Sequence, residues 1–406
     1  MKSSIITLMT LFLFISCGPG KTLSSNSVAK KSVEIIQPTN LTEFHQEKYL
    51  NVARSALQAH QNKVGFLSPQ TWMKPFVAYA AEIECGSVIT ENITVSGTLD
   101  CSKYEGEFAL ILYGKQAKLD GGKDGFKILF PQGKIGLILS GEAPSVEHVE
   151  VSGLKEGVAV MVFDAEDATI INSEFNSNMI GVFAYADSTK MSGLQIEDNT
   201  ISGSSLFGIH VNSNFEKGIF VSTPVIHNNN LSNSESYALH LRTDQMNFND
   251  EENKNTFSGS QNGFYLTGGI FSYDKMSLDN QENGIEKTII FVSEASEFSM
   301  KSSQLVGTGK NIDQDAYGLH LYKVEKISIE DIQISSFDVG IKISSDQNQS
   351  SEISIKDGEI STNSLAGIMI QAYDEKASLD FDITDIKYDE NSVHDLWLVG
   401  IEKQKS

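Results

Sequence analysis

The sequence predicts an all-β fold in which short strands stack as the coils of a single solenoid. Three observations predict it. From Cys85 onward, short β-branched runs alternate with Asn, Asp, Ser and Gly, as strands alternate with turns. The runs recur every 22 to 30 residues, apart from one interval of 55, and repeats of this length bury a core only by stacking. The apolar period of a helix is not found in this region.

Composition narrows the functions that are available. The chain has 406 residues, with 31 Lys and Arg against 53 Asp and Glu, and a formal net charge of −22. A nucleic-acid partner is not expected, because phosphate binding needs clustered basic side chains. An acidic polymer would also be repelled, unless a cation bridges the charges.

The first 16 residues have the pattern of an export signal. Lys2 precedes an apolar run over 5–15 that is too short to span a bilayer. The sequence Phe-Ile-Ser-Cys at 14–17 resembles the lipobox of bacterial lipoproteins, which implies that Cys17 is lipidated after cleavage. An ordinary export signal is the alternative. The resemblance implies a cell-envelope protein, anchored in the outer membrane and facing the periplasm or the surface.

Three segments follow the signal. Residues 17–40 are rich in Gly, Ser, Lys and Asn, which is typical of a flexible tether. Residues 41–84 are expected to form a helical cap on the N-terminal end of the solenoid, and 85–401 the solenoid itself. A second short helix of the cap is predicted with Pro75 in its first turn. The first helix is predicted from apolar residues at helical spacing, namely Phe44, Leu50, Ala53 and Leu57.

Cys85 and Cys101 are the two cysteines that remain if Cys17 is lipidated. In an oxidising envelope they are expected to form a disulfide. Such a bond closes a loop of ~15 residues and adds roughly 3 kcal/mol of stability in the chain-entropy model. Two free, buried thiols are the alternative.

Each repeat begins with a small residue that is followed by alternating apolar positions. The starts are Gly157, Gly181, Gly208, Ala238, Gly263, Gly318, Gly340, Gly367 and Asp395. The interval of 55 residues after Gly263 is interpreted as one coil with an insertion. The reason is that the run 288–293 leads to Leu305 much as the run 218–222 leads to Leu231.

Asn199, Asn229 and Asn255 occupy equivalent positions in three consecutive repeats, two residues before an apolar marker. Because residues i and i−2 share a face of a strand, these side chains should point inward with the marker. Stacked amides can hydrogen-bond along the solenoid axis and so satisfy buried polar groups. The column is therefore predicted to be a structural Asn ladder, and a ligand role is the alternative.

This pattern resembles the right-handed parallel β-helix family, a fold shared by pectate lyases and many bacterial surface proteins. The resemblance covers about residues 85–400 and includes the opening segment from Cys85 to Cys101 and Ala-Lys-Leu-Asp-Gly-Gly at 117–122. It implies a single right-handed parallel β-helix of about eleven coils, roughly 50 Å long, with a short α-helical N-terminal cap. It selects no function, because this fold hosts lyases, hydrolases, epimerases, adhesins and binding modules.

The outward face of the first strand in each coil is the candidate binding surface. One outward row contains Ala159, Phe183, His210, His240, Tyr265, His320, Lys342, Met369 and Trp397. The next row contains Met161, Tyr185, Asn212, Arg242, Thr267, Tyr322, Ser344 and Gln371. Rings can stack on sugars and polar groups can bind hydroxyls, so a saccharide groove is predicted here; a solvated strand face is the alternative. The expected ligand-binding residues are Phe183, Tyr185, His210, Asn212, His320 and Tyr322.

The leading functional interpretation is binding of a glycan or surface polymer along this face. The first alternative is a polysaccharide lyase or hydrolase with His240, Arg242 and Tyr265 as catalytic residues. In that case His240 or Arg242 would be the base, and Tyr265 or Tyr322 would protonate the leaving oxygen. The second alternative is a non-catalytic adhesive stalk.

No cofactor is expected, with Ca²⁺ as the alternative. The Ca²⁺ hypothesis rests on turn residues that follow the first strand; we prefer to interpret them as turn residues on an acidic surface. They are Asp164, Asp187, Asp244 and Asp346. A metal held by His210, His240 and His320 is a further hypothesis.

Overall fold

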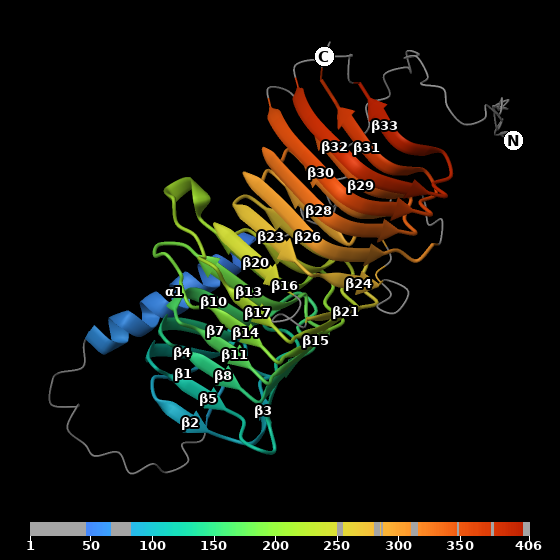
Figure 1. Cartoon of the computed structure of the whole chain (residues 1–406). Coiled ribbons are helices and arrows are strands. Elements are labelled where there is room, and N and C mark those ends of the chain that lie inside the picture. The colour runs from blue at the N-terminus through green and yellow to red at the C-terminus, as the bar shows by residue number, and fades with distance from the viewer. Residues whose placement is uncertain are drawn as a thin grey trace, which may run out of the picture.

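The computed structural model describes residues 46–65, 83–249, 255–279, 285, 287–309, 316–346, 349–374 and 377–400. They form a single parallel β-helix, with the helix α1 (Gln46–Gly65) against its side (Figure 1). The predicted all-β fold class is confirmed. The export signal, the lipidated Cys17, the tether and the second cap helix lie outside the described residues. The described part of the chain contains no helix whose length and apolar character suit a membrane span.

The longest sheet has 13 strands, all paired in parallel. Its strands are β1 (Ser87–Ile89), β4 (Phe108–Lys115), β7 (Ile135–Glu142), β10 (Val158–Glu166), β13 (Ile180–Ala186), β16 (Phe207–Ser213), β19 (Tyr237–Leu241), β22 (Asn262–Thr267), β25 (Ile290–Ser293), β27 (Tyr317–Tyr322), β29 (Val339–Ser345), β31 (Ala366–Ala372) and β33 (His394–Val399). Short β-branched and aliphatic runs supply these strands, with alternate side chains directed into the solenoid.

Two further sheets complete the first coils. One contains β2 (Asn92–Thr94), β5 (Lys118–Asp120), β8 (Ser145–Glu147), β11 (Thr169–Ile171), β14 (Gln195–Glu197) and β17 (Val225–His227). The other contains β3 (Gly97–Asp100), β6 (Phe126–Leu129), β9 (Val149–Ser152), β12 (Glu174–Asn176), β15 (Thr200–Ser202), β18 (Asn230–Ser232) and β21 (Thr256–Ser258). A 3₁₀ turn, η3 (Phe215–Lys217), follows β16.

In the later coils a single sheet of longer strands takes the place of these two sheets. The strands are β20 (Gln245–Asn249), β23 (Ile270–Asp274), β24 (Ser277–Asp279), β26 (Glu297–Val306), β28 (Lys326–Ser335), β30 (Ser350–Ser361) and β32 (Ser378–Asp389). Asp331, Asp357 and Asp385 bend the long strands, with φ of 53°, 52° and 55°. Asp visits this left-handed region more readily than most residues, which explains the acidic residues at these corners.

A small residue stands near the start of most strands of the longest sheet, because a larger side chain there would meet the backbone of the next coil. A Cβ at Gly181 would lie 2.6 Å from the carbonyl oxygen of Gly208 in the next coil. A Cβ at Gly263 would lie 2.5 Å from the carbonyl oxygen of Ile289. The structure corrects two sequence interpretations. Ala159, not Gly157, is the small residue of β10. The interval of 55 residues holds two coils rather than one with an insertion, because β25 lies within it. Ile289, just before β25, stands where most other coils have a small residue.

The predicted Asn ladder is present. The Asn199 Nδ2 donates to Asn229 Oδ1 at 3.0 Å, and the Asn229 Nδ2 donates to Asn255 Oδ1 at 3.0 Å. Each Nδ2 also donates to a backbone carbonyl, at 2.9 Å for Asn199 and 2.7 Å for the other two. The column therefore satisfies polar groups at an inner corner and carries a structural role.

The disulfide between Cys85 and Cys101 is also present. It joins the chain just before β1 to the residue that follows β3, so it closes the first coil on itself. Behind it the interior is filled by aliphatic and aromatic side chains, one set per coil. The predicted pairing of these cysteines is confirmed.

The helix α1 lies along the outer face of the longest sheet. Tyr49, Leu50 and Ala53 are buried, and they pack in one apolar cluster with outward side chains of the sheet such as Met161 and Phe183. The segment 41–84 was expected to sit on the open N-terminal end of the solenoid, whereas the described helix covers a side. Figure 1 shows α1 beside the coils from β4 to β16.

Candidate functional site

The outward side chains of the longest sheet align in the predicted rows from Phe183 onward. From β10 to β33 the first row is Met161, Phe183, His210, His240, Tyr265, Phe291, His320, Lys342, Met369 and Trp397. Met161 takes the place predicted for Ala159, and Phe163 the place predicted for Met161. Phe291 and Ser293 belong to the coil that the sequence interpretation missed.

Six rings of this row, from Phe183 to His320, form a continuous ring stack. The centroid separations along it are 4.8, 4.5, 4.5, 5.0 and 4.8 Å. Tyr265 is nearly parallel to both neighbours, at 12° to His240 and 14° to Phe291. The two faces of the Tyr265 ring are therefore used by the protein itself. A sugar cannot stack on this ring, contrary to the sequence-based expectation.

Much of the predicted ligand surface is buried. The exposed fractions of Phe183, His210, Tyr185, His240 and Tyr322 are 0, 1, 4, 6 and 6%. Asn212, Arg242, Tyr265 and His320 are half-buried. The alternation of a strand predicts which side chains point outward, but it does not show whether another element covers them. Here α1 covers Phe183 and Tyr185, so the open part of the face is narrower than predicted.

Arg242 is the most distinctive charge on this face. Its guanidinium lies 4.7 Å from the ring centre of Phe215, which η3 holds against it. It forms no ion pair with any described residue, and its buried Nε has no hydrogen-bond partner among them. A buried guanidinium nitrogen without a partner is costly. Arg242 is therefore a half-buried cation whose charge no described residue balances.

Hydroxyl groups lie beside this cation. The Tyr265 hydroxyl is 3.2 Å from Ser293 Oγ, and Ser293 Oγ lies 3.5 Å from Thr267 Oγ1. Burial raises the pKa of Tyr265, and the positive charge of Arg242 opposes this rise. The phenol is therefore protonated at neutral pH and can donate a hydrogen bond. Arg242, Tyr265 and Thr267, with Ser293, form a polar cluster, which is the candidate acidic-group site.

His240 lies behind this site. Both of its ring nitrogens are buried and have no hydrogen-bond partner among the described residues. Burial, followed by the nearby His210 and Arg242, holds the pKa of His240 well below 6.5. The imidazole is therefore neutral, as a general base must be, but its ring is held between His210 and Tyr265 at 4.5 Å from each. It does not reach the surface where a polymer would lie.

His320 and Tyr322 lie farther along the sheet. The Tyr322 hydroxyl donates to Asp346 Oδ2 at 3.0 Å, and Lys323 pairs with the same oxygen at 2.8 Å. His320 Nε2 is 3.4 Å from Ser344 Oγ. His320 and Tyr322 thus have hydrogen-bond partners of their own and are not part of the site around Arg242.

The three-histidine metal hypothesis is not supported by the geometry. His210 and His240 are neighbours, but the rings of Tyr265 and Phe291 separate His240 from His320. Imidazoles on one metal must converge on a single point, and these three are spread along the axis.

The proposed Ca²⁺ aspartates are engaged by other groups of the protein. Asp164 accepts from the backbone nitrogen of Asp187, and Asp187 accepts from Arg54. Asp244 accepts from Ser222 and from the backbone of Gln245, and Asp346 binds Tyr322 and Lys323.

Another group of metal-ligand side chains lies on the opposite part of the solenoid. Ligand atoms of Asp120, Glu147 and His148 lie within 4.8 Å of one another. Lys118 Nζ already pairs with Asp120 at 3.3 Å and with Glu147 at 2.7 Å. The ammonium thus pairs with both carboxylates and offsets one of their two negative charges, so the group is explained as an ion-pair network.

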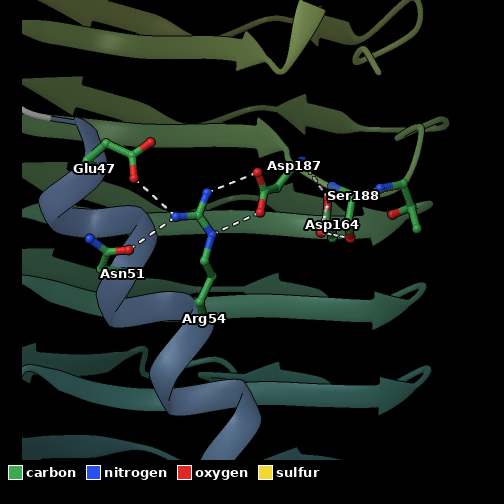
Figure 2. Close-up of polar contacts among 7 residues, drawn as sticks. Glu47, Asn51, Arg54, Asp164, Asp187 and Ser188 are labelled. Carbon is green, nitrogen blue, oxygen red and sulfur yellow. Dashed lines mark hydrogen bonds and ion pairs between the residues drawn. The ribbon is translucent and has the colours of Figure 1, made fainter. Parts of the chain in front are cut away.

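A polar latch fixes α1 to the sheet (Figure 2). Arg54 donates from Nε and Nη2 to the two oxygens of Asp187, at 2.9 Å each. Asp164 accepts from the backbone nitrogen of Asp187 at 2.7 Å and so orients that turn. At the N-terminal end of α1, Gln46 Oε1 accepts from Asn212 Nδ2 at 2.9 Å. The hydrogen bonds from Arg54 hold the pKa of Asp187 below its usual range.

No family model matches the chain, and no curated protein matches it. Among solved structures, the A-module of a mannuronan C-5 epimerase from Azotobacter vinelandii is 12% identical, with a TM-score of 0.46 over 76% of this chain and 91% of that one. A periplasmic alginate epimerase is 10% identical, with a TM-score of 0.36 over 76% and 85% of the two chains. A mannuronic acid specific polysaccharide lyase from human gut microbiota is 8% identical, with a TM-score of 0.23 over 78% and 87%. At such identities a likeness concerns the fold alone.

Proposed function

We propose that this protein binds a glycan on the outer face of its longest sheet, and that Arg242 receives an acidic group of that glycan. The observation that carries the proposal is the half-buried Arg242 without an ion pair to a described residue. An arginine fork pairs with a carboxylate through two parallel hydrogen bonds. Tyr265 and Thr267 beside it offer hydroxyls to the neighbouring sugar oxygens.

The geometry favours hydrogen bonding over ring stacking as the means of recognition. The faces of the Tyr265 ring are occupied by His240 and Phe291, so its hydroxyl is the part that meets a ligand. The net charge of −22 repels a polyanion at long range. Salt screens exposed charges beyond about 8 Å, so a single guanidinium in direct contact can still select an acidic sugar.

The proposed location is the bacterial cell envelope, with the chain anchored through a lipid on Cys17. Support comes from the apolar run and the Phe-Ile-Ser-Cys sequence at 14–17, and from the disulfide, which fits an oxidising compartment. Metabolic labelling with a palmitate analogue, compared between the natural chain and Cys17→Ser, tests the anchor. Equal labelling of both chains would remove it from the proposal.

Binding is tested with the chain from residue 18 onward. An array of acidic and neutral polysaccharides identifies the ligand, and calorimetry then measures its affinity. Arg242→Ala is expected to weaken binding of the acidic glycan about 10- to 100-fold, because hydrogen bonds to charged groups contribute about 1.5–3 kcal/mol. Arg242→Lys should restore part of it. The matched control is Lys127→Ala, which removes a half-buried cation already paired with Glu150. Equal affinity of the natural chain and Arg242→Ala would contradict the proposal.

A β-elimination at the same site is the second candidate. It is favoured by the protonated Tyr265, a proton donor beside Arg242. Elimination creates an unsaturated sugar with a new ultraviolet absorbance, which the same samples can report over time. Absorbance that grows with the natural chain and not with Tyr265→Phe would make the protein a lyase. A flat trace with intact binding leaves it a binding protein.

A further inference from the structure

A separate hollow lies at the starts of β7 and β10, whereas Arg242 follows the end of β19. Its volume is about 400 Å³. It forms where the first turn of α1 meets two successive corners, the one between β6 and β7 and the one between β9 and β10. Its lining includes Lys48, Gln132, Lys134, Lys155 and Glu156. A volume of this size suits a small ligand.

Three lysines from three different segments line this hollow. Lys48 and Lys155 are exposed and form no ion pair with a described residue. Lys134 is half-buried and pairs with Glu107 of the preceding coil. Glu156 is the one carboxylate of the lining. In a chain with 53 acidic and 31 basic residues, this local excess of positive charge runs against the overall composition.

The walls that carry these lysines are rigid. The Tyr49 hydroxyl donates to the carbonyl of Glu156 at 2.6 Å and ties α1 to the second corner. A Cβ at Gly157 would lie 2.8 Å from the carbonyl oxygen of Lys134, and Val158 donates to that same carbonyl at 2.9 Å. The two corners are thus packed directly on each other, so the lysine backbones keep fixed positions around the hollow.

We propose that this hollow binds a phosphomonoester carried by a sugar or by a lipid headgroup. A phosphate dianion presents three acceptor oxygens, and separate lysine ammoniums approach it as independent point charges. A planar carboxylate would instead suit a single arginine fork. The hollow is larger than a phosphate alone, so it leaves room for the group that bears the phosphate, next to the Gln132 side chain.

The test is calorimetry of the chain from residue 18 onward with glucose phosphate and with glucose. Binding of the phosphate ester and not of the free sugar is expected, with an affinity that falls as salt is raised. Lys48→Ala combined with Lys155→Ala should weaken it about tenfold or more. Lys387→Ala, which removes an exposed lysine paired with Glu359 at the far end of the solenoid, should leave it unchanged.

A second arm separates the two sources of the phosphate. The same proteins are sedimented with phosphatidylcholine vesicles that contain or lack phosphatidic acid, whose headgroup is a phosphomonoester. Binding to these vesicles that the double variant loses assigns the hollow to a lipid headgroup, whereas glucose phosphate binding alone assigns it to a free sugar phosphate. The proposal is overturned if neither ligand binds, or if the double variant binds as well as the natural chain. Because Arg242 is untouched in these variants, either result is independent of the acidic-group site.

Discussion

His210 and His240 show how burial decides the chemistry of a single residue. Both lie in the ring stack with almost no exposed surface. Burial lowers the pKa of His210 to about 3. Burial, followed by the nearby His210 and Arg242, holds the pKa of His240 well below 6.5. Two side chains that are often catalytic or metal-binding therefore act here as neutral flat rings that fill space between coils.

A pH dependence of stability follows from these two residues. An imidazole in the unfolded chain titrates near 6.5, so below that pH the unfolded state binds more protons than the folded state. The free energy of unfolding should therefore fall as pH is lowered below about 6.5, by about 1.4 kcal/mol per pH unit for each histidine. Urea unfolding at a series of pH values measures this slope.

The matched variants of this prediction are His210→Phe and Phe183→Leu. The first removes one buried titrating ring from a stack that already contains Phe183 and Phe291. The slope should therefore decrease by about 1.4 kcal/mol per pH unit, which corresponds to one proton. The second removes a ring of the same stack that carries no titrating group and should leave the slope unchanged. A slope in His210→Phe equal to that of the natural chain would show that His210 does not titrate as described.

At the scale of elements, the corners of the coils depend on side chains that stand in for backbone groups. Asn229 lies in the middle of the ladder. Its Oδ1 accepts from the backbone and the amide of Asn199, and its Nδ2 donates to Asn255 and to the carbonyl of Ile196. A single side chain therefore satisfies polar atoms in three coils.

Replacement of Asn229 by Ala should destabilise the solenoid by about 2–4 kcal/mol, because several buried donors and acceptors lose their partners together. Asn230→Ala is the matched control, since Asn230 is the next residue and points outward to solvent. Chemical unfolding of both variants measures the difference. Equal stability of the two would mean that water or a backbone shift replaces the ladder at no cost.

The sequence predicted those parts of the fold that repeat from coil to coil. Alternation and spacing located the strands, the Asn ladder and the outward row from Phe183 onward. They missed β25, because Ile289 stands where other coils have a small residue. They also did not predict that α1 covers Phe183 and Tyr185. A helical period predicts that a segment is a helix, but not the surface on which the helix packs. The sequence thus predicted which residue types face outward on the longest sheet, but not how deeply they are buried.

At the scale of the whole molecule, α1 divides the outer face into a covered part and an open part. The helix packs on the earlier coils, while Arg242 and Tyr265 lie beyond it and remain half-buried. Solenoids are held together by contacts between neighbouring coils. A helix attached to the side of such a stack can therefore detach without unfolding the coils beneath it.

The latch between Arg54 and Asp187 tests this division. Arg54→Ala removes the bidentate pair, and with one partner partly exposed the expected loss is about 1 kcal/mol of docking energy. Leu50→Asp places a charge on a fully buried position of the same helix and should detach it completely. Hydrogen exchange of the α1 amides should rise modestly in the first variant and to the unprotected rate in the second.

The amides of the coils supply the decisive comparison for α1. Glu47→Gln removes the exposed partner of Arg54 and should leave exchange in α1 close to that of the natural chain. In Leu50→Asp, protection of β22 to β31 should persist while α1 is free, because those strands lie beyond the helix. Loss of protection along the whole stack in step with α1 would mean that the helix is part of the cooperative core. Glycan affinity measured on the same variant then shows whether a ligand at Arg242 also depends on the Gln46–Asn212 contact at the end of the helix.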